Sequence, residues 1–387
     1  MSTTRRYLEL GLRVAKHSEE LIDSYFGPEE IAQTVAAEGL RDPEALRDEA
    51  QELLADVADD RWLAAHVTAL WAETRKLAGE TLTYAEEGEL VYGIEPRWRD
   101  EQPFRVAAGL LEDTLPGPGD VRARLARWYE TTAIPAEILE PALRDVAAEL
   151  RRLAAERIGL PEGEDFELEL VTGKRWLGYA RYLGGLRTHI SVNTDLPVPA
   201  SVLVELVAHE IYGGHHTHRA WQEVELVRGR GELEWTMELL WSPSAVIAEG
   251  IATTACSIVA GDGAPALAAS VLGRLGFEYD ADTGARVTEA ARQLAGVSAN
   301  VGMLIHDRGA STEEAREYAA TWSLQPDERL DRMVASQASR PSAVYSHTYG
   351  RGRELVTAYV QGDPQRFREL MTKRVLPVDL AASLAGL

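Results

Sequence analysis

Apolar residues recur at the spacing of an α-helix over most of the chain. In the first predicted helix, Leu8, Leu12 and Ala15 share one face, which continues through residues 21–22 and ends before Gly27. Further helices are predicted over residues 43–58, 61–79, 83–93, 102–115, 119–131 and 135–159. We therefore expect an N-terminal helical region that covers residues 1–160.

The spacing changes to a period of two in two short segments. FELELV (166–171) alternates apolar and polar residues, and RTHISVNTD (187–195) does so more weakly. Helical spacing returns after residue 200. The pattern predicts a mainly α fold with a small pair of strands just before a histidine-rich helix. The second region, residues 161–387, can also form one continuous domain with the first. The segment 187–195 is either an internal strand or an edge that pairs with an extended substrate.

Composition restricts the partners. The 387 residues carry a net charge of −22, which disfavours binding to nucleic acid or to an anionic membrane. The single cysteine, Cys256, allows neither an intrachain disulfide nor a cysteine-based zinc finger, and we expect it to be a small core residue. No apolar run has the length of a signal peptide or a membrane span, so a cytoplasmic protein is expected. The oligomeric state is not readable from these features.

The strongest chemical signal is HEIYGGHHTH, residues 209–218, which holds four of the nine histidines. Catalytic zinc sites need neutral imidazoles, often a carboxylate, and an open position for water. In the helical H-E-x-x-H motif the second histidine lies one turn after the first. Here His209 and Glu210 are followed by Gly213 at that position, so the strict motif fails.

Two geometries can still bring a second imidazole to His209. A distortion at Gly213-Gly214 can absorb two residues and place His215 where the second histidine is needed, since glycine permits such a distortion. In an unbroken helix, His216 would lie about 20° around the axis and about 10.5 Å along it from His209. We favour His215 and keep His216 as the alternative.

The expected third ligand is Glu249, in the segment SAVIAEGIATTACSIVA. Its neighbours are apolar, and a glutamate among them is costly unless it is paired or bound to a metal. Gly250 would let this helix approach another closely. The alternative is a glutamate on the exposed stripe of an amphipathic helix.

These residues resemble the signature of a known family. HE-x-x-Gly-Gly-His-His is similar to the HE-x-x-Pro-Gly-His-His signature of the DUF885 family, whose helical members resemble zinc metallopeptidases. AEGIA resembles the family's Glu-Gly-Trp-Ala segment, with Glu249 at the glutamate. IHDRGASTEEAREY resembles its His-x-x-Gly-x-Ser segment and places His306 at the histidine. The likeness covers the C-terminal half, whereas the N-terminal half matches only in helical character.

The chain departs from the family at three positions. Gly213 replaces the proline of the signature, and Ile251 replaces the tryptophan. RPSAVYSHTYGRGREL resembles the family's Pro-Gly-Gln-Ala…Tyr…Gly segment, and counting from its proline puts the family tyrosine at His347. Tyr345 and Tyr349 lie two residues to either side of it. The closing Leu-Pro motif is matched by VLPVDL.

The resemblance and the motif together predict a zinc-dependent hydrolase of peptide or small amide substrates, with a helical zincin-like architecture. We expect Zn²⁺ at His209, His215 and Glu249, with Glu210 as the general base. The remaining candidates either stabilise the oxyanion or support the site and contact substrate; they are His347 and Tyr349 in the first role and His216, His306 and Tyr345 in the second. The alternatives are a non-hydrolytic metal protein and a non-catalytic helical scaffold with a degenerate site.

Overall fold

Helices form most of the computed structural model, which describes residues 2–386. The helices before the larger sheet are α1 (Thr3–Ala15), α2 (Glu29–Ala37), α3 (Pro43–Asp56), α4 (Arg61–Leu77), α5 (Tyr84–Tyr92), α6 (Gln102–Thr114), α7 (Val121–Thr131) and α8 (Ala136–Arg157). Those after it are α9 (Leu203–Glu210), α10 (His215–Gln222), α11 (Pro243–Val259), α12 (Ala264–Arg274), α13 (Ala281–Leu294), α14 (Gly296–His306), α15 (Thr312–Ser323), α16 (Asp327–Gln337), α17 (Arg340–Val360), α18 (Pro364–Met371) and α19 (Pro377–Ala381). The prediction of a mainly α fold is confirmed.

Local signals set several helix ends where the sequence predicts them. The side chain of Asp60 accepts a hydrogen bond from the backbone N–H of Leu63 and caps α4. Thr83 and Glu86 form a reciprocal capping box at the start of α5. Gly93, with a φ of 66°, ends α5 in the left-handed region that glycine adopts without strain.

The larger sheet has three strands in the order β2-β4-β3: β2 (Asp165–Val171), β3 (Gly178–Gly184) and β4 (Arg187–Asn193). The two predicted strands do pair, as parallel neighbours, and β3 adds an antiparallel partner on the other side of β4. Sequence reasoning missed β3, which is bounded by glycines. Because β4 is hydrogen-bonded along both edges, the alternative that it pairs with an extended substrate is wrong.

A second sheet corrects the first predicted helix. Helix α1 ends at Ala15, and Ile22–Tyr25 form a short strand, β1, instead of a further helical turn. This strand pairs antiparallel with β5 (Met237–Leu239). Leu21 and Ile22 do pack into the core, but Ile22 belongs to a strand because its partner, β5, lies far away in the sequence.

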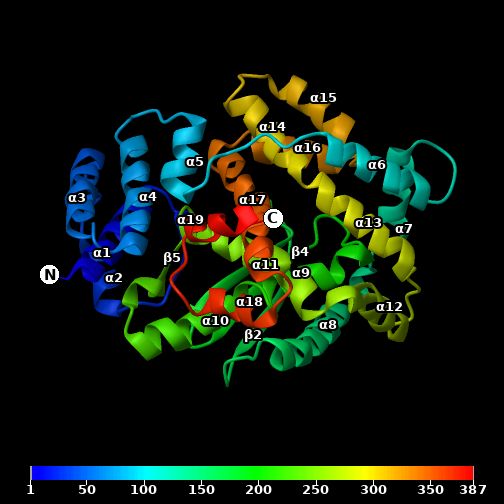
Figure 1. Cartoon of the computed structure of the whole chain (residues 1–387), viewed down its shortest axis with the longest axis horizontal. Coiled ribbons are helices and arrows are strands. Elements are labelled where there is room, and N and C mark those ends of the chain that lie inside the picture. Colours follow the sequence, from blue (N-terminus) through cyan, green and yellow to red (C-terminus); the bar gives the residue numbers. More distant parts are fainter. Residues whose placement is uncertain (1, 387) are drawn as a thin grey trace.

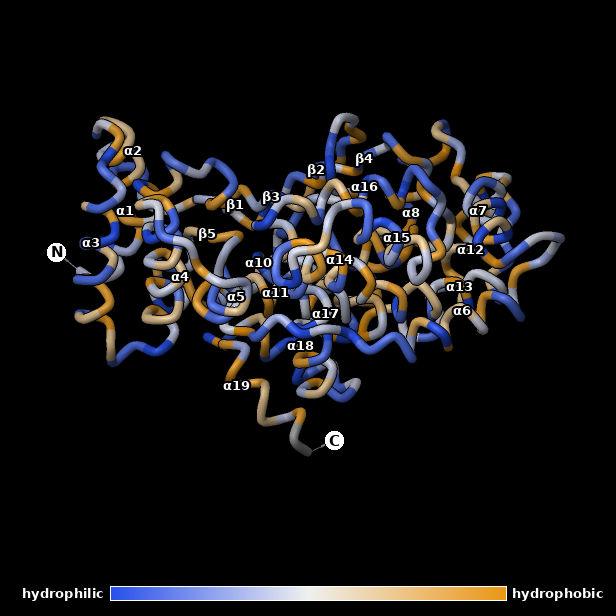
Figure 2. The backbone as a smooth tube through the Cα atoms, turned by 90° about the horizontal axis from the view of Figure 1, so that it is seen from above, coloured by the Kyte–Doolittle hydropathy of each residue, from blue (hydrophilic) through white to orange (hydrophobic). Residues whose placement is uncertain are grey.

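Two apolar cores organise the molecule. The larger one gathers residues from α1, α3, α4, α8, α9, α11 and α17, and the smaller one gathers residues from α6, α7, α13, α14, α15 and α16. Figure 1 shows α1–α4 at one end of the molecule and α6, α7 and α13 at the other, with α11 and α17 between them. The view from above in Figure 2 shows the same elongated arrangement.

Helices α11 and α17 cross with their backbones in contact. A Cβ added at Gly250 would lie 2.5 Å from the carbonyl oxygen of Gly352, and one added at Gly352 would lie 2.2 Å from that of Val246. No side chain larger than hydrogen fits at either position. The expected close approach at Gly250 is therefore present, and it fixes α17 beside Glu249.

Among residues 2–386, no single helix is both long and apolar enough to cross a membrane. The pair formed by α11 and Gly261–Arg274 meets both criteria together, with a bend of 81° at the join.

Candidate metal centre

The histidine-rich segment forms two helices, separated by a break at residues 211–214. Helix α9 ends at Glu210, and α10 begins at His215. Thr217 bridges the break: its backbone N–H and its hydroxyl both donate to the carbonyl of Ile211, and its hydroxyl oxygen accepts from the N–H of Gly213. The predicted distortion at the two glycines is thus a full interruption of the helix.

Both glycines are required by this break. Gly213 has a φ of +104°, and a Cβ there would lie 2.7 Å from the Val259 side chain. At Gly214 a Cβ would lie 1.7 Å from the carbonyl oxygen of His209. The start of α10 therefore folds back against the last turn of α9, and this brings His215 next to His209.

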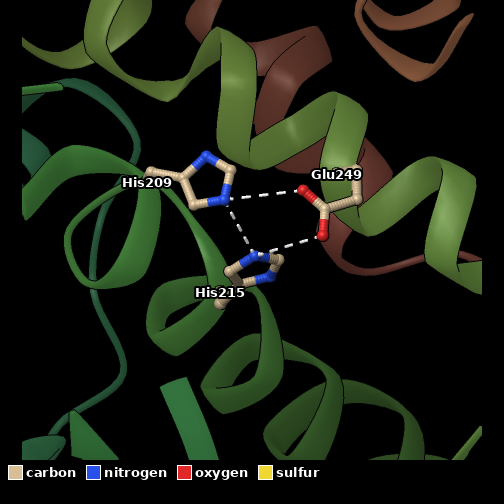
Figure 3. A group of neighbouring side chains, drawn as sticks. All are labelled: His209, His215 and Glu249. Atoms are coloured by element: carbon tan, nitrogen blue, oxygen red, sulfur yellow. Dashed lines mark hydrogen bonds and ion pairs between the residues drawn. The ribbon is translucent and has the colours of Figure 1, made fainter. Parts of the chain in front are cut away.

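His209, His215 and Glu249 converge (Figure 3), and their potential ligand atoms all lie within 4.8 Å of one another. The two imidazole Nε2 atoms are 3.2 Å apart. From the Glu249 carboxylate, Oε2 lies 3.5 Å from Nε2 of His209, and Oε1 lies 3.9 Å from Nε2 of His215. This group could hold a metal ion.

The spacing suits a tetrahedral ion. Metal–ligand bonds of roughly 2.0–2.2 Å at tetrahedral angles put ligand atoms about 3.3–3.6 Å apart. The separations of 3.2 and 3.5 Å are close to that geometry. The 3.9 Å separation involves the other oxygen of Glu249, so this side chain would have to move for one oxygen to serve both histidines. Three protein ligands would also leave a fourth position open.

The carboxylate of Glu249 is buried and only half satisfied. Its side chain is 4% exposed, and Oε1 accepts a 2.6 Å hydrogen bond from the hydroxyl of Tyr345. Its other oxygen, Oε2, is buried without a hydrogen-bond partner in the described part of the chain. Burial raises the pKa of Glu249 to about 7, and the Tyr345 hydrogen bond opposes this shift. A cation at this place would satisfy the unpartnered oxygen.

Burial keeps both histidines in the form that binds metals. It lowers the pKa of His209 to about 4, and it lowers the pKa of His215 well below the ordinary value, with His209 adding to the effect. Both imidazoles are therefore neutral near pH 7 and have a free lone pair to offer.

Glu210 lies beside this group and is 6% exposed. A Cβ at Gly178 would come within 2.5 Å of its Oε1, so the backbone of β3 lies directly against the carboxylate. Burial raises the pKa of Glu210 well above its usual range, and the charges of Glu249 and Asp23 raise it further. A divalent cation among these acids would offset their repulsion.

His216 lies outside the group. It is fully buried, with Nδ1 at 2.7 Å from the Thr188 hydroxyl and Nε2 at 2.8 Å from Oε2 of Glu164. Both ring nitrogens are thus engaged in attaching α10 to the sheet. His218 is also buried, at 2% exposed, and its Nε2 pairs with the side-chain amide of Gln222.

The candidates on α17 face two different ways. Tyr345 and Tyr349 are one turn apart, and the Tyr349 ring stacks on that of His209 with centroids 6.4 Å apart. His347 is buried on another face, where its Nε2 lies 3.1 Å from the Tyr84 hydroxyl. His306 stacks on the same Tyr84 ring at 6.3 Å and pairs with the carbonyl of residue 337.

One neighbour of the site could not be found from the sequence. Asp23, on β1, accepts a 2.6 Å hydrogen bond from the hydroxyl of Tyr179 on β3. Its charge raises the pKa of both Glu210 and Glu249. No local motif marks Asp23, because 156 positions separate it from Tyr179 and only the fold brings them together.

Comparison with known proteins gives a fold likeness only. No family model matches the chain, so the resemblance to DUF885 stays a prediction. No curated protein matches it either.

Three solved structures are similar at low identity. A "putative lipoprotein" from Colwellia psychrerythraea matches with a TM-score of 0.52 and 14% identity, over 92% of this chain and 65% of that one. This chain therefore spans only about two thirds of that protein. A "putative lipoprotein of unknown function" from Shewanella oneidensis matches with a TM-score of 0.50 and 15% identity, over 93% and 70% of the two chains. The M32 carboxypeptidase from Deinococcus radiodurans R1 matches with a TM-score of only 0.41 and 13% identity, over 100% of this chain and 94% of that one.

Proposed function

We propose that this protein is a zinc-dependent hydrolase of peptide or amide bonds, with the ion held by His209, His215 and Glu249. One observation carries the proposal: two neutral imidazoles and a buried carboxylate with an unpartnered oxygen converge, with their ligand atoms within 4.8 Å of one another. Two histidines and one glutamate are a donor set found in catalytic zinc sites. Nitrogen and oxygen ligands also suit other transition metals, so the identity of the metal belongs to the proposal.

Glu210 supports hydrolysis over other metal chemistry. A zinc ion at this place would supply Lewis acidity, which lowers the pKa of a coordinated water and polarises a carbonyl oxygen. Glu210 directly follows the ligand His209, is buried, and makes no ion pair within the described residues. In the proposed reaction its carboxylate accepts the proton of the attacking water and passes it to the leaving nitrogen.

Tyr349 is the better candidate for stabilising the developing oxyanion. Its ring lies against His209, whereas the Nε2 of His347 is engaged with Tyr84. Tyr349 is 41% exposed as a residue, and its hydroxyl lies near the carboxylate of Glu249, at the centre itself. Its O–H would donate a hydrogen bond to the substrate oxygen as negative charge develops there.

The test is Glu210→Gln in protein purified without chelators or a histidine tag. The variant should retain about one zinc per chain and lose hydrolysis of a panel of peptides and N-acyl amino acids, because glutamine preserves the shape but cannot accept the proton. Metal content by elemental analysis and rates by amine release are measured on the same samples.

Glu225→Gln serves as the matched control. Glu225 is a half-buried glutamate in the helical segment after α10 and lies away from the ligands in the sequence. It should keep both metal and activity. Normal hydrolysis by Glu210→Gln would remove the base assignment, and absence of metal from the unsubstituted protein, even after zinc is supplied, would remove the hydrolase.

A further inference from the structure

A large cavity begins one helical turn from the candidate metal centre. Its volume is about 950 Å³, in the range of small-molecule binding sites. Three of the elements around the centre, α9, α11 and α17, also line this cavity: Glu205 lies one turn before His209, Thr253 lies one turn after Glu249, and Tyr349 stacks on His209. A substrate whose reacting bond lies at the centre can therefore extend into the cavity.

The cavity wall is mainly apolar but carries three guanidinium groups. Trp98, Phe104, Val287 and Ala299 are among its apolar residues. Two of the three arginines are neutralised: Arg99 pairs with Glu354, and Arg292 pairs with Glu205. The third arginine, Arg353, differs from both.

Among residues 2–384, whose side chains the structure describes, Arg353 has no ion-pair or hydrogen-bond partner, although its own side chain is half-buried. Burial lowers the pKa of Arg353, and the neighbouring Arg292 lowers it further, while Glu205 opposes the shift. Glu205 is already paired with Arg292. Arg292 is also paired with Glu289, which opposes the same shift. Arg353 is therefore left without a carboxylate of its own, and a half-buried guanidinium without an anionic partner is costly.

Arg353 also continues the stripe of α17 that faces the centre. Tyr345 bonds to Glu249, Tyr349 stacks on His209, and Arg353 follows one turn later, about 6 Å further along the helix axis. A guanidinium offers a planar fork of donors that matches a carboxylate. A ligand that extends from the centre along this stripe would reach it.

We propose that Arg353 binds a free carboxylate of the substrate, so that the protein acts on amides which carry a carboxylate and an apolar group. The hydrolysis in this inference rests on the proposed function, whereas the binding of a carboxylate by Arg353 does not. N-acyl amino acids and the C-terminal ends of peptides share this chemistry. Sequence reasoning did not single out Arg353, because its missing partner is visible only in the fold.

Binding is tested with two matched pairs of probes: N-acetyl-L-phenylalanine and its amide, and the tripeptide Ala-Ala-Phe and its C-terminal amide. Calorimetry uses the full chain carrying Glu210→Gln, to prevent turnover, and is repeated after chelation, so that no carboxylate can bind a metal ion. The carboxylate member of at least one pair should bind about 10- to 100-fold more tightly than its amide. A preference in the first pair alone identifies N-acyl amino acids, and one in the second alone identifies peptide C-termini.

Arg353→Gln should remove the preference, and Arg351→Gln should keep it. Arg351 is on the same helix but pairs with Glu354 at 3.0 Å, so this control removes the same charge from a place outside the cavity lining. Arg353→Lys keeps the charge without the fork and should weaken the preference, which preserves the test if the glutamine variant fails to fold. The proposal would be overturned if Arg353→Gln still preferred the carboxylate probe, or if the unsubstituted residue 353 bound acid and amide equally in both pairs. Because binding is measured on chelated protein, the result of this test is independent of whether the protein is a zinc hydrolase.

Discussion

Tyr345 donates a 2.6 Å hydrogen bond to Oε1 of Glu249, which leaves Oε2 of the same carboxylate as the oxygen without a partner. The tyrosine thus fixes the rotation of the carboxylate and directs the other oxygen towards His209, at 3.5 Å. Groups that orient a metal ligand in this way are part of a metal site.

Tyr345→Phe should therefore weaken zinc binding by roughly 10- to 100-fold and lower the free energy of unfolding by only about 1 kcal/mol. Competition with a chromophoric chelator measures the first quantity, and urea denaturation measures the second. Unchanged zinc affinity in the folded variant would contradict the role of Tyr345.

Removal of either imidazole should abolish stoichiometric metal. His209→Ala and His215→Ala each delete a direct ligand, so the loss of affinity should exceed the roughly 10- to 100-fold that loss of an outer partner costs. His306→Ala should retain the metal, because His306 stacks on Tyr84, apart from the ligands. Elemental analysis after gel filtration decides between these outcomes.

Gly214→Ala should destabilise the protein by at least about 2 kcal/mol and reduce metal content, since the new Cβ would overlap the carbonyl oxygen of His209. Gly109→Ala is the control. Gly109 lies exposed within α6 with open space around it, so alanine should stabilise the protein by about 0.5–1 kcal/mol. Thermal denaturation of the two variants should shift in opposite directions.

The metal-free protein should lose stability in acid partly through His66. This residue is 2% exposed, with its ring nitrogens against the Trp62 carbonyl and the Ser244 hydroxyl. Burial lowers the pKa of His66 from 6.5 to about 4, so between these values the unfolded chain binds the extra proton. Its contribution is fully present above pH 6.5 and falls by about 3 kcal/mol as the pH approaches 4.

His66→Gln removes that titration. Its free energy of unfolding, measured by urea denaturation between pH 7 and 4, should vary less steeply with pH than that of the unsubstituted protein. Equal slopes would show that His66 does not titrate in this window.

Tyr349→Phe should lower kcat for amide hydrolysis by roughly 100-fold and leave zinc content intact, because it removes a donor proposed to act in the transition state. His347→Gln should have a smaller effect on kcat, since His347 contacts Tyr84 on another face of α17. The reverse order of effects would return the oxyanion role to His347.

Much of the helical framework is readable from the sequence because its signals are local. Capping residues such as Asp60 and Thr83 act over three or four positions, and the motif around His209 occupies one short segment. The β1–β5 pair, the contact of Asp23 with Tyr179 and the orientation of His347 depend on residues far apart in the chain. Counting from the family segment places the tyrosine at His347, but a shift of two residues rotates a side chain by about 200° around a helix.

The backbone crossing at Gly250 and Gly352 also bears on how fast a metal would enter and leave. It locks the helix that carries Glu249 to the one that carries Tyr345 and Tyr349, without flexible side chains between them. A metal site on this framework would be formed before the ion binds, unlike a zinc finger, which folds only around its ion. Uptake should then be limited by diffusion and ligand exchange, and repeated stripping and reloading should leave the helical content of the protein unchanged.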